Sequence, residues 1–304
     1  GFLSRRVELL PENTLELLTV GAVVGKEFNL NLAASLLVLS ASQIVVALDA
    51  ARTRHFVWIR PDSGECAFVH DKIRAALLAR LTSERRRYLH HRIAYHLQEE
   101  NPERVFDLAY HFDAAGDHSA ALPYALQAAE QARAEPALKI AEDQYRIAER
   151  ASSAEKGTCY WIAEGLGDVL MLQGRYSEAG ELFERALRLA EEPLTEAKIR
   201  GKLGERDYKR GDMERAGIAF EDALRLLDKP MPERNIQYVV MLLQQVAIQT
   251  LHAWLPRWFV GRYKRKPSDT ELLRLQLLSR LGRAYWYTHS RMQDFCVHLL
   301  GMNL

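Results

Sequence analysis

The sequence contains few cysteines, and none of them stands in a metal-binding or redox pattern. Cys66, Cys159 and Cys296 are the only three in 304 residues, and they lie far apart. No Cys-x-x-Cys pair and no Cys/His cluster occurs, so the sequence favours neither a zinc site nor a disulfide framework. Free thiols are typical of the reducing cytosol, and we therefore expect a cytoplasmic protein.

An excess of charge of one sign is also missing. The 41 Lys and Arg residues nearly balance the 40 Asp and Glu residues, giving a net charge of +1. No general attraction to nucleic acid or to a membrane surface follows from such a balance. The most apolar run, residues 30–46, is too short and too polar to span a bilayer, and no secretory signal is visible. The composition is that of a soluble globular chain, long enough for two domains or for one domain and an array.

Motifs for nucleotide hydrolysis and nucleophilic catalysis are absent. No Gly-x4-Gly-Lys-Ser/Thr occurs, because residues 21–26 have the wrong spacing and Glu27 replaces the magnesium-binding hydroxyl. No Gly-x-Ser-x-Gly and no Ser/His/Asp set stands out. We therefore expect no enzyme activity from this chain. It begins at Gly1 and ends inside a repeat pattern at Leu304, which suggests a piece of a longer protein.

Several histidines lie close together, but their spacing does not suit a metal. His90, His91 and His96 share one expected helix and are one, five and six residues apart. Helical ligands need spacings of three or four. His111 and His118 follow at larger distances, so we expect no metal site.

What the sequence does contain is an internal repeat. Residues 163–189 and 203–226 carry the same residue types at an offset of 37. The matched positions are Gly167, Ala179, Phe183 and Ala186 in the first copy, and Gly204, Ala216, Phe220 and Ala223 in the second. A repeat of this length predicts stacked helical hairpins, each too small to bury its apolar face alone.

The repeated residues indicate how each hairpin is built. The small residues let two antiparallel helices approach closely, and Gly174 and Gly211 can end the first helix in a left-handed conformation. We expect Phe183 and Phe220 to fill the gap to the neighbouring unit. This pattern of Leu-Gly, Gly-x-Tyr and Ala-x3-Phe-x2-Ala resembles the tetratricopeptide repeat. The resemblance implies an α-solenoid whose concave face binds a protein or peptide.

The first hundred residues predict a different domain. The expected elements are helices at 5–24, 30–39 and 43–52, and strands at 55–60 and 65–70 around a Pro-Asp-Ser-Gly turn. Asn29 or Asn31 can cap the second helix, and Ser40 or Ser42 the third. Three helices followed by a β-hairpin are typical of a winged helix. We thus predict a mainly α protein, with a winged-helix domain and linker helix over 1–100 and an array over 101–304.

The array is expected to be uneven. Residues 103–150 carry degenerate repeats, the clear repeats lie near 160–192 and 197–229, and the last unit is truncated. Before that last unit, residues 254–267 mix aromatic and basic residues. Such a segment can bind nucleic acid or acidic peptides, but we favour packing of its aromatics under the array with the cations in water.

A winged helix allows a DNA-binding interpretation, with residues 43–52 as recognition helix. That helix offers only Arg52 and the nearby Arg54 as cations, and it contains Asp49. Groove reading needs several cations or amides on one face. The charges therefore disfavour nucleic acid as a partner.

Residues 68–74, Phe-Val-His-Asp-Lys-Ile-Arg, stand where the second strand should turn into a helix. This hydrophobic-His-Asp series is similar to a motif in the winged-helix domains of STAND-class signalling ATPases. The resemblance implies that His70, with Asp71 and Arg74 as further candidates, contacts ADP held by a neighbouring NTPase domain. It further implies ADP or ATP with Mg in a parent chain. From the residues alone, His70 can equally bond the backbone at the helix start, Asp71 can cap that helix, and Arg74 can be solvated.

Further segments extend this resemblance over nearly the whole chain. They are Ala22-Val-Val-Gly25-x2-Phe28, Leu89-His90-x2-Ile93-Ala94, Leu108-Ala-Tyr-His111 and Ala120-Ala121 ahead of Tyr124-x3-Ala128. We expect a regulatory segment of a signalling ATPase, in which the array binds an inducer and the winged helix couples to an intramolecular NTPase domain. The alternatives are a scaffold without nucleotide coupling and a DNA-binding regulator.

Overall fold

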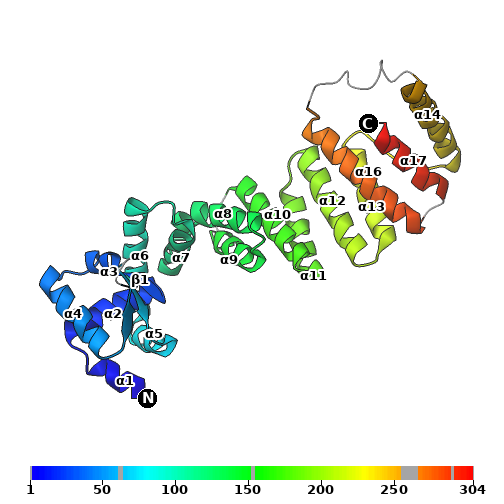
Figure 1. Ribbon diagram of the computed structural model, residues 1–304. Coiled ribbons are helices and arrows are strands. Elements are labelled where there is room, and N and C mark those ends of the chain that lie inside the picture. The colour runs from blue at the N-terminus through cyan, green and yellow to red at the C-terminus, as the bar shows by residue number, and fades with distance from the viewer. Residues whose placement is uncertain (1, 61–63, 152–154, 255–265, 289–290, 304) are drawn as a thin grey trace. The chain divides into compact units, whose positions relative to one another are not determined.

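Helices make up most of the chain, as predicted, and one small sheet lies in its first part (Figure 1). This computed structural model describes residues 2–60, 64–151, 155–254, 266–288 and 291–303. The chain divides into two compact units, unit 1 at Gly1–Ser153 and unit 2 at Ala154–Leu304. The predicted domain boundary at residue 100 lies inside unit 1 and stays a prediction.

Unit 1 begins with helices and short strands that share one core. In chain order these elements are α1 (Phe2–Glu8), α2 (Glu12–Val24), β1 (Glu27–Asn29), α3 (Leu30–Ser35), α4 (Ala41–Thr53), β2 (Val57–Ile59), β3 (Glu65–Phe68) and α5 (Asp71–Leu78). Within the described residues the strands form an antiparallel sheet of order β1-β3-β2. Phe28 lies opposite Cys66 in the register, and both are buried. Helix α2 packs against α4, α5 and β1 and contributes Leu17 and Leu18 to the core.

Several local predictions for unit 1 are confirmed. Asn29 accepts hydrogen bonds from the backbone at the start of α3. Ser40 forms a capping box with Gln43 at the start of α4. The expected strands are present as β2 and β3, and Phe28 is a core residue.

Other predictions for unit 1 are wrong in detail. The single helix expected over 5–24 is two helices, because Pro11 lies at the start of α2, where its missing N–H is tolerated. Helix α3 ends at Ser35 rather than at Leu39. Strand β1 was not expected, since three residues form a strand only through their pairing with β3.

The rest of unit 1 is helical. It consists of α6 (Ser83–Glu100), α7 (Val105–Ala115), α8 (His118–Ala134) and α9 (Leu138–Glu149). Gly116 ends α7 in the left-handed region, with φ of 86°. Each of these helices packs against the next one along the chain. Small residues on α8, such as Ala125 and Ala128, are fully buried and allow that close packing.

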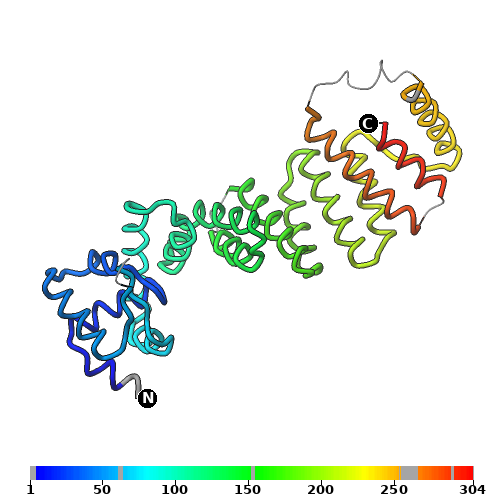
Figure 2. The backbone as a smooth tube through the Cα atoms, viewed as in Figure 1, coloured from blue at the N-terminus to red at the C-terminus, as the bar shows by residue number. Residues whose placement is uncertain are grey.

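Unit 2 is built from antiparallel helical hairpins, which the backbone trace makes visible (Figure 2). Its elements are α10 (Lys156–Leu172), α11 (Tyr176–Leu189), α12 (Pro193–Lys209), α13 (Met213–Leu226), α14 (Asn235–Trp254), α16 (Asp269–Thr288) and α17 (Arg291–Met302). Helix α11 packs on α12, α13 packs on α16, and α14 packs on α17. The aromatic and basic segment predicted to pack under the array lies almost wholly in residues 255–265, outside the described residues.

The repeated residues hold each hairpin together. A Cβ added to Gly167 would lie 2.5 Å from Cε1 of Phe183, and one added to Gly204 would lie 2.7 Å from Cε1 of Phe220. The two rings therefore pack over the glycine of their own hairpin. They also face the next unit, as expected: Nζ of Lys202 on α12 lies 5.7 Å from the centroid of the Phe183 ring, and Phe220 shares a core cluster with Leu277 of α16. Ala179, Ala186, Ala216 and Ala223 are fully buried beside the rings.

The turns between these helices use glycine as predicted. Gly174 and Gly211 have φ of 77° and 85°, a region in which a Cβ is strained. Helix α16 carries a third Leu-Gly pair, Leu281 and Gly282, but within the described part of the chain no aromatic ring lies within 4 Å of a Cβ added to this glycine. Its nearest neighbour is the Asp294 carboxylate, at 3.4 Å from an added Cβ.

Candidate functional site

A groove crosses three helices of unit 2. It is formed by α10, α12 and α16, the first helices of their hairpins, and encloses about 620 Å³. The lining positions are one, three or four residues apart along α12 and α16, and Trp161 and Asp168 are seven apart on α10, so those of each helix lie on one side of it. The groove therefore follows from the repeat, because each hairpin presents the same face of its first helix.

A buried carboxylate joins α10 to α12 at the floor of the groove. Glu164 is 3% exposed, and its Oε1 lies 2.6 Å from Nζ of both Lys198 and Lys202. Lys202 also contacts Asp168 at 2.7 Å. Burial acts to raise the pKa of Glu164, but the two ammonium groups outweigh burial and lower it. Glu164 therefore stays ionised and fixes both lysines.

An exposed tryptophan dominates the wall of the groove. The Trp161 side chain on α10 is 59% exposed, and Nζ of Lys198 lies 5.4 Å from its ring centroid. Leu272 on α16 adds a second exposed apolar side chain. Arg280 pairs with Glu205 at 2.7 Å, so this cation is matched by a carboxylate within the groove. The groove thus combines an aromatic platform with a neutral polar rim, which suits an apolar side chain of a peptide.

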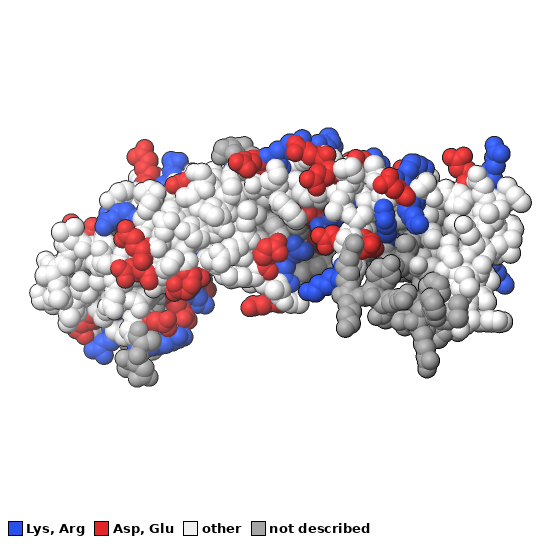
Figure 3. All heavy atoms as spheres, turned by 90° about the horizontal axis from the view of Figure 1, so that it is seen from above, with Lys and Arg blue, Asp and Glu red and all other residues white. Residues whose placement is uncertain are grey.

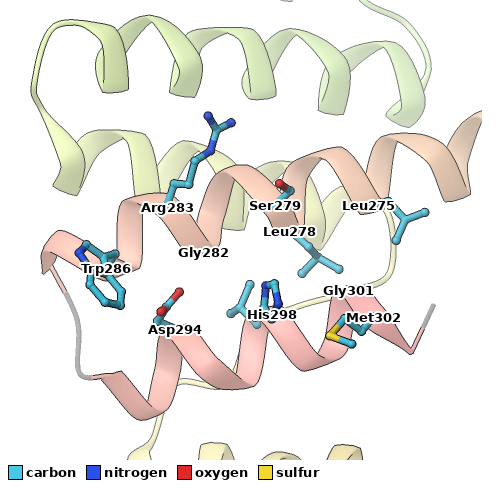
Figure 4. Close-up of a pocket in the computed structure, with 11 residues that line it drawn as sticks. Leu275, Leu278, Ser279, Gly282, Arg283, Trp286, Asp294, His298, Gly301 and Met302 are labelled. Atoms are coloured by element: carbon cyan, nitrogen blue, oxygen red, sulfur yellow. The ribbon is translucent and has the colours of Figure 1, made fainter. Parts of the chain in front are cut away.

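A second hollow lies between α16 and α17 and encloses about 540 Å³ (Figure 4). Trp286 and Leu278 of α16 face Asp294 and His298 of α17 across it, whereas the Arg283 side chain points away from α17 (Figure 4). Gly282 lies on its floor and leaves the space open. The hollow holds the His298 imidazole and the Asp294 carboxylate beside the Trp286 ring, so it offers both polar and apolar groups to a bound molecule.

The predicted nucleotide contacts lie together at the start of α5. His70 is the N-cap residue, and its Nδ1 accepts a hydrogen bond from the Lys72 N–H at 3.1 Å. Asp71 is the first helical residue, so the prediction that it caps the helix is wrong. His70 takes this role because its backbone is extended, with φ of −150°.

The neighbours of His70 have structural partners of their own. Asp71 lies 3.5 Å from Nζ of Lys26, and both side chains are well exposed. Arg74 donates from Nε to the carbonyl of Ala22 at 2.8 Å, which ties α5 to α2. Arg74 is therefore not merely solvated, while the His70 ring itself remains exposed.

A buried histidine pair in unit 1 was not expected from the sequence. Nδ1 of His90 on α6 lies 2.9 Å from Nδ1 of His111 on α7, and both rings are 1% exposed. One Nδ1 atom must donate and the other must accept, so only one of the two Nδ1 atoms carries a proton. Burial and the nearby Arg86 and Arg74 lower the pKa of His90 to about 4. Burial, and secondarily His90, lowers the pKa of His111 to about 3.

No group of three or more His, Cys, Asp or Glu side chains arranged to hold a metal is found among the described residues. In the same part of the chain, no helix is both long enough and apolar enough to cross a membrane.

The exposed face of α4 does not resemble a groove-reading helix. Val45 and Val46 are exposed on it. Arg52 pairs with Asp49 at 2.9 Å, and Arg54 donates to the carbonyl of Leu9. The cations that a DNA-binding interpretation requires thus have partners within unit 1.

Comparison with known proteins identifies the repeat. The tetratricopeptide-repeat family model matches residues 158–229, which cover α10 to α13. This part of the chain is therefore a tetratricopeptide-repeat region, which points to a non-enzymatic interaction scaffold. No curated protein matches the chain.

A solved structure with some likeness is the crystal structure of BtubC (BKLC) from P. vanneervenii. It is 20% identical, the match covers 72% of this chain and 89% of that chain, and the TM-score is 0.32. A likeness of this size carries no information about function.

Proposed function

We propose that unit 2 binds a segment of a partner protein in the groove of α10, α12 and α16. The observation that supports this most is Trp161, a large aromatic side chain left exposed over a rigid, charge-paired floor. Exposed aromatics in a concave site are typical anchors of protein interfaces. Tetratricopeptide repeats are interaction modules, and residues 158–229 form such a region.

The floor of the groove keeps the anchor in place before any partner arrives. Lys198 lies over the Trp161 ring and is itself held by Glu164. A side chain fixed in this way loses little conformational freedom on binding, so less of the interaction energy is spent on ordering it. The paired charges contribute selectivity rather than strong attraction, because each cation already has a carboxylate.

Selection from a library of displayed random peptides tests this proposal. The library is panned against the full chain, and enriched peptides are titrated by calorimetry. We expect Trp161→Ala to weaken binding at least tenfold, about 1.4 kcal/mol. Trp286→Ala, at an equally exposed tryptophan outside the groove, is the control and should bind as the parent does. Equal loss in both variants, or no enriched peptide, would contradict the proposal.

We further propose that unit 1 contains a winged helix and contacts a nucleotide-binding domain of a STAND-class signalling ATPase. The order of α2, α3, α4 and the β2–β3 hairpin supports the first part. His70 supports the second. Its Nδ1 accepts a hydrogen bond, so the neutral ring carries its proton on Nε2 and can donate to a phosphate oxygen.

The roles of the three candidate residues then differ. ADP or ATP with Mg would be bound mainly by the NTPase domain, and the nucleotide would supply the phosphate oxygens. His70 would donate to them, and Arg74 would add positive charge while staying tied to Ala22. The Asp71 carboxylate accepts hydrogen bonds and is negatively charged, so it would repel a phosphate group. Its contribution would be to position Lys26. The signalling ATPase would have two conformations. A partner that binds unit 2 more tightly in one of them would shift the equilibrium toward that conformation.

The natural protein, including any sequence that precedes Gly1, allows a direct test. It is purified, denatured and assayed for released nucleotide. We expect ADP from the parent and from the control His91→Ala, whose side chain is exposed, but not from His70→Ala. Equal amounts of ADP from all three proteins would show that His70 does not hold the nucleotide and acts only as a helix cap. ADP in none would contradict nucleotide coupling and leave the groove proposal untouched.

A further inference from the structure

Helix α14 has an apolar face that the described part of unit 2 leaves uncovered. Its 20 residues include no Asp, Glu, Lys or Arg. One face packs on the neighbouring helices: the hydroxyls of Tyr238 and Tyr285 lie 3.1 Å apart, and Asn303 donates to the carbonyl of Gln245. The opposite face carries large aliphatic side chains that are open to solvent, whereas the apolar face of a helix is normally buried against another element.

The uncovered face is a continuous stripe. Its members are 37–67% exposed, and all but the last are one or three residues apart along one side of the helix: Ile236, Val239, Val240, Leu243, Val246 and Leu251. In Figure 3 the end of unit 2 that carries α14, at the right of the view, is largely free of charged side chains. Contiguous apolar surface of this kind marks an interaction site.

We propose that two copies of this chain associate through α14, stripe against stripe, in a two-fold symmetric dimer. Two-fold dimers are the commonest assemblies because one surface serves both partners. A stripe without charged groups is complementary to itself, since no like charges meet when two copies face each other. The charge pairs of unit 2 that could select a different partner line the groove, and the stripe carries no charged residue for such selection.

The size of the stripe fits this partner. A helix of 20 residues is about 30 Å long, and the stripe follows it from Ile236 to Leu251. Six half-exposed aliphatic side chains expose several hundred Å², of the order of the ~800 Å² per partner that a stable interface buries. The dimer contact is independent of the proposed groove, because Trp161 and the stripe belong to different helices.

Sedimentation equilibrium of the full chain tests the dimer. The parent and Ile218→Lys, a control at an exposed apolar residue of α13, should both have the mass of a dimer at micromolar concentration. Leu243→Lys should have the mass of a monomer and an unchanged circular dichroism spectrum. A monomeric parent, a larger assembly, or a dimeric Leu243→Lys would overturn the proposal.

A crosslinking variant tests the same contact without the Leu243→Lys substitution, in case that substitution disturbs the fold. Leu243 lies near the midpoint of α14, so in a two-fold dimer it approaches its own counterpart. In a Cys159→Ser background the remaining cysteines, Cys66 and Cys296, are buried. Leu243→Cys should then form a disulfide-linked dimer with a mild oxidant, whereas Ile218→Cys should not. Equal crosslinking of both, or of neither, would contradict the contact.

Discussion

Phe183 and Phe220 show at the scale of single residues why the repeat needs glycine. Each ring is buried against a glycine on the preceding helix, at a distance that leaves no room for a methyl group. Gly217, by contrast, has no heavy atom within 4 Å of an added Cβ. The two kinds of glycine look alike in the sequence and differ only in their surroundings.

The first prediction compares these glycines. Gly167→Ala should destabilise the protein, because displacing a buried ring costs about 1–3 kcal/mol and outweighs a helix-propensity gain of up to about 1 kcal/mol. Gly217→Ala should stabilise it by up to about 1 kcal/mol. Urea denaturation followed by circular dichroism measures both. A stabilised Gly167→Ala would show that the ring does not pack as described.

The second prediction concerns the buried pair of His90 and His111. Their pKa values of about 4 and about 3 lie below the ordinary value of 6.5. The unfolded chain therefore binds protons that the folded chain does not as the pH falls below 6.5. Stability should be full above that pH and decline towards pH 4, by on the order of 3 kcal/mol for His90.

Denaturation midpoints between pH 7.5 and roughly pH 4.5 provide the measurement. His90→Asn keeps a hydrogen-bonding partner for His111 but cannot titrate, so its stability should depend less on pH. The control His91→Asn, at the exposed neighbouring residue, should keep the parental slope. Identical slopes in all three proteins would show that the pair does not control acid stability.

At the scale of elements, the helices were more predictable than their contacts. Glycine, alanine and phenylalanine at a fixed offset predict α10 to α13, and Ser40 predicts the start of α4, because caps and small-residue faces act locally. Strand β1 exists only through its pairing with β3, which no local pattern contains. The same limit applies to His90 and His111, which lie on different helices.

The third prediction tests the link between α10 and α12. Glu164 is buried between Lys198 and Lys202, so replacing both lysines by methionine leaves an unpaired buried charge. We expect a loss of about 3–5 kcal/mol, measured as the change in free energy of unfolding. Adding Glu164→Leu to the double variant removes that charge and should restore much of the loss. A double variant as stable as the parent would mean that Glu164 is not ionised in the fold.

For the whole molecule, the sequence predicts the helical repeat more directly than it predicts the division of the chain into two parts. A tetratricopeptide-repeat region is established over residues 158–229, whereas the winged helix, the nucleotide contact and the domain boundary remain proposals. The groove itself could not be predicted, because Trp161, Lys198 and Leu272 come from three helices distributed over more than a hundred residues. These side chains lie close together only because of how the hairpins stack, and no sequence motif predicts that stacking.

Hydrogen–deuterium exchange of the full chain, with and without a selected peptide, measures directly whether a partner occupies the groove. If the groove of unit 2 binds the partner, amides in α10, α12 and α16 should exchange more slowly in the complex, and those in α4 and α5 should not change. Protection that is confined to unit 1 or to α14, with α10, α12 and α16 unchanged, would contradict the account.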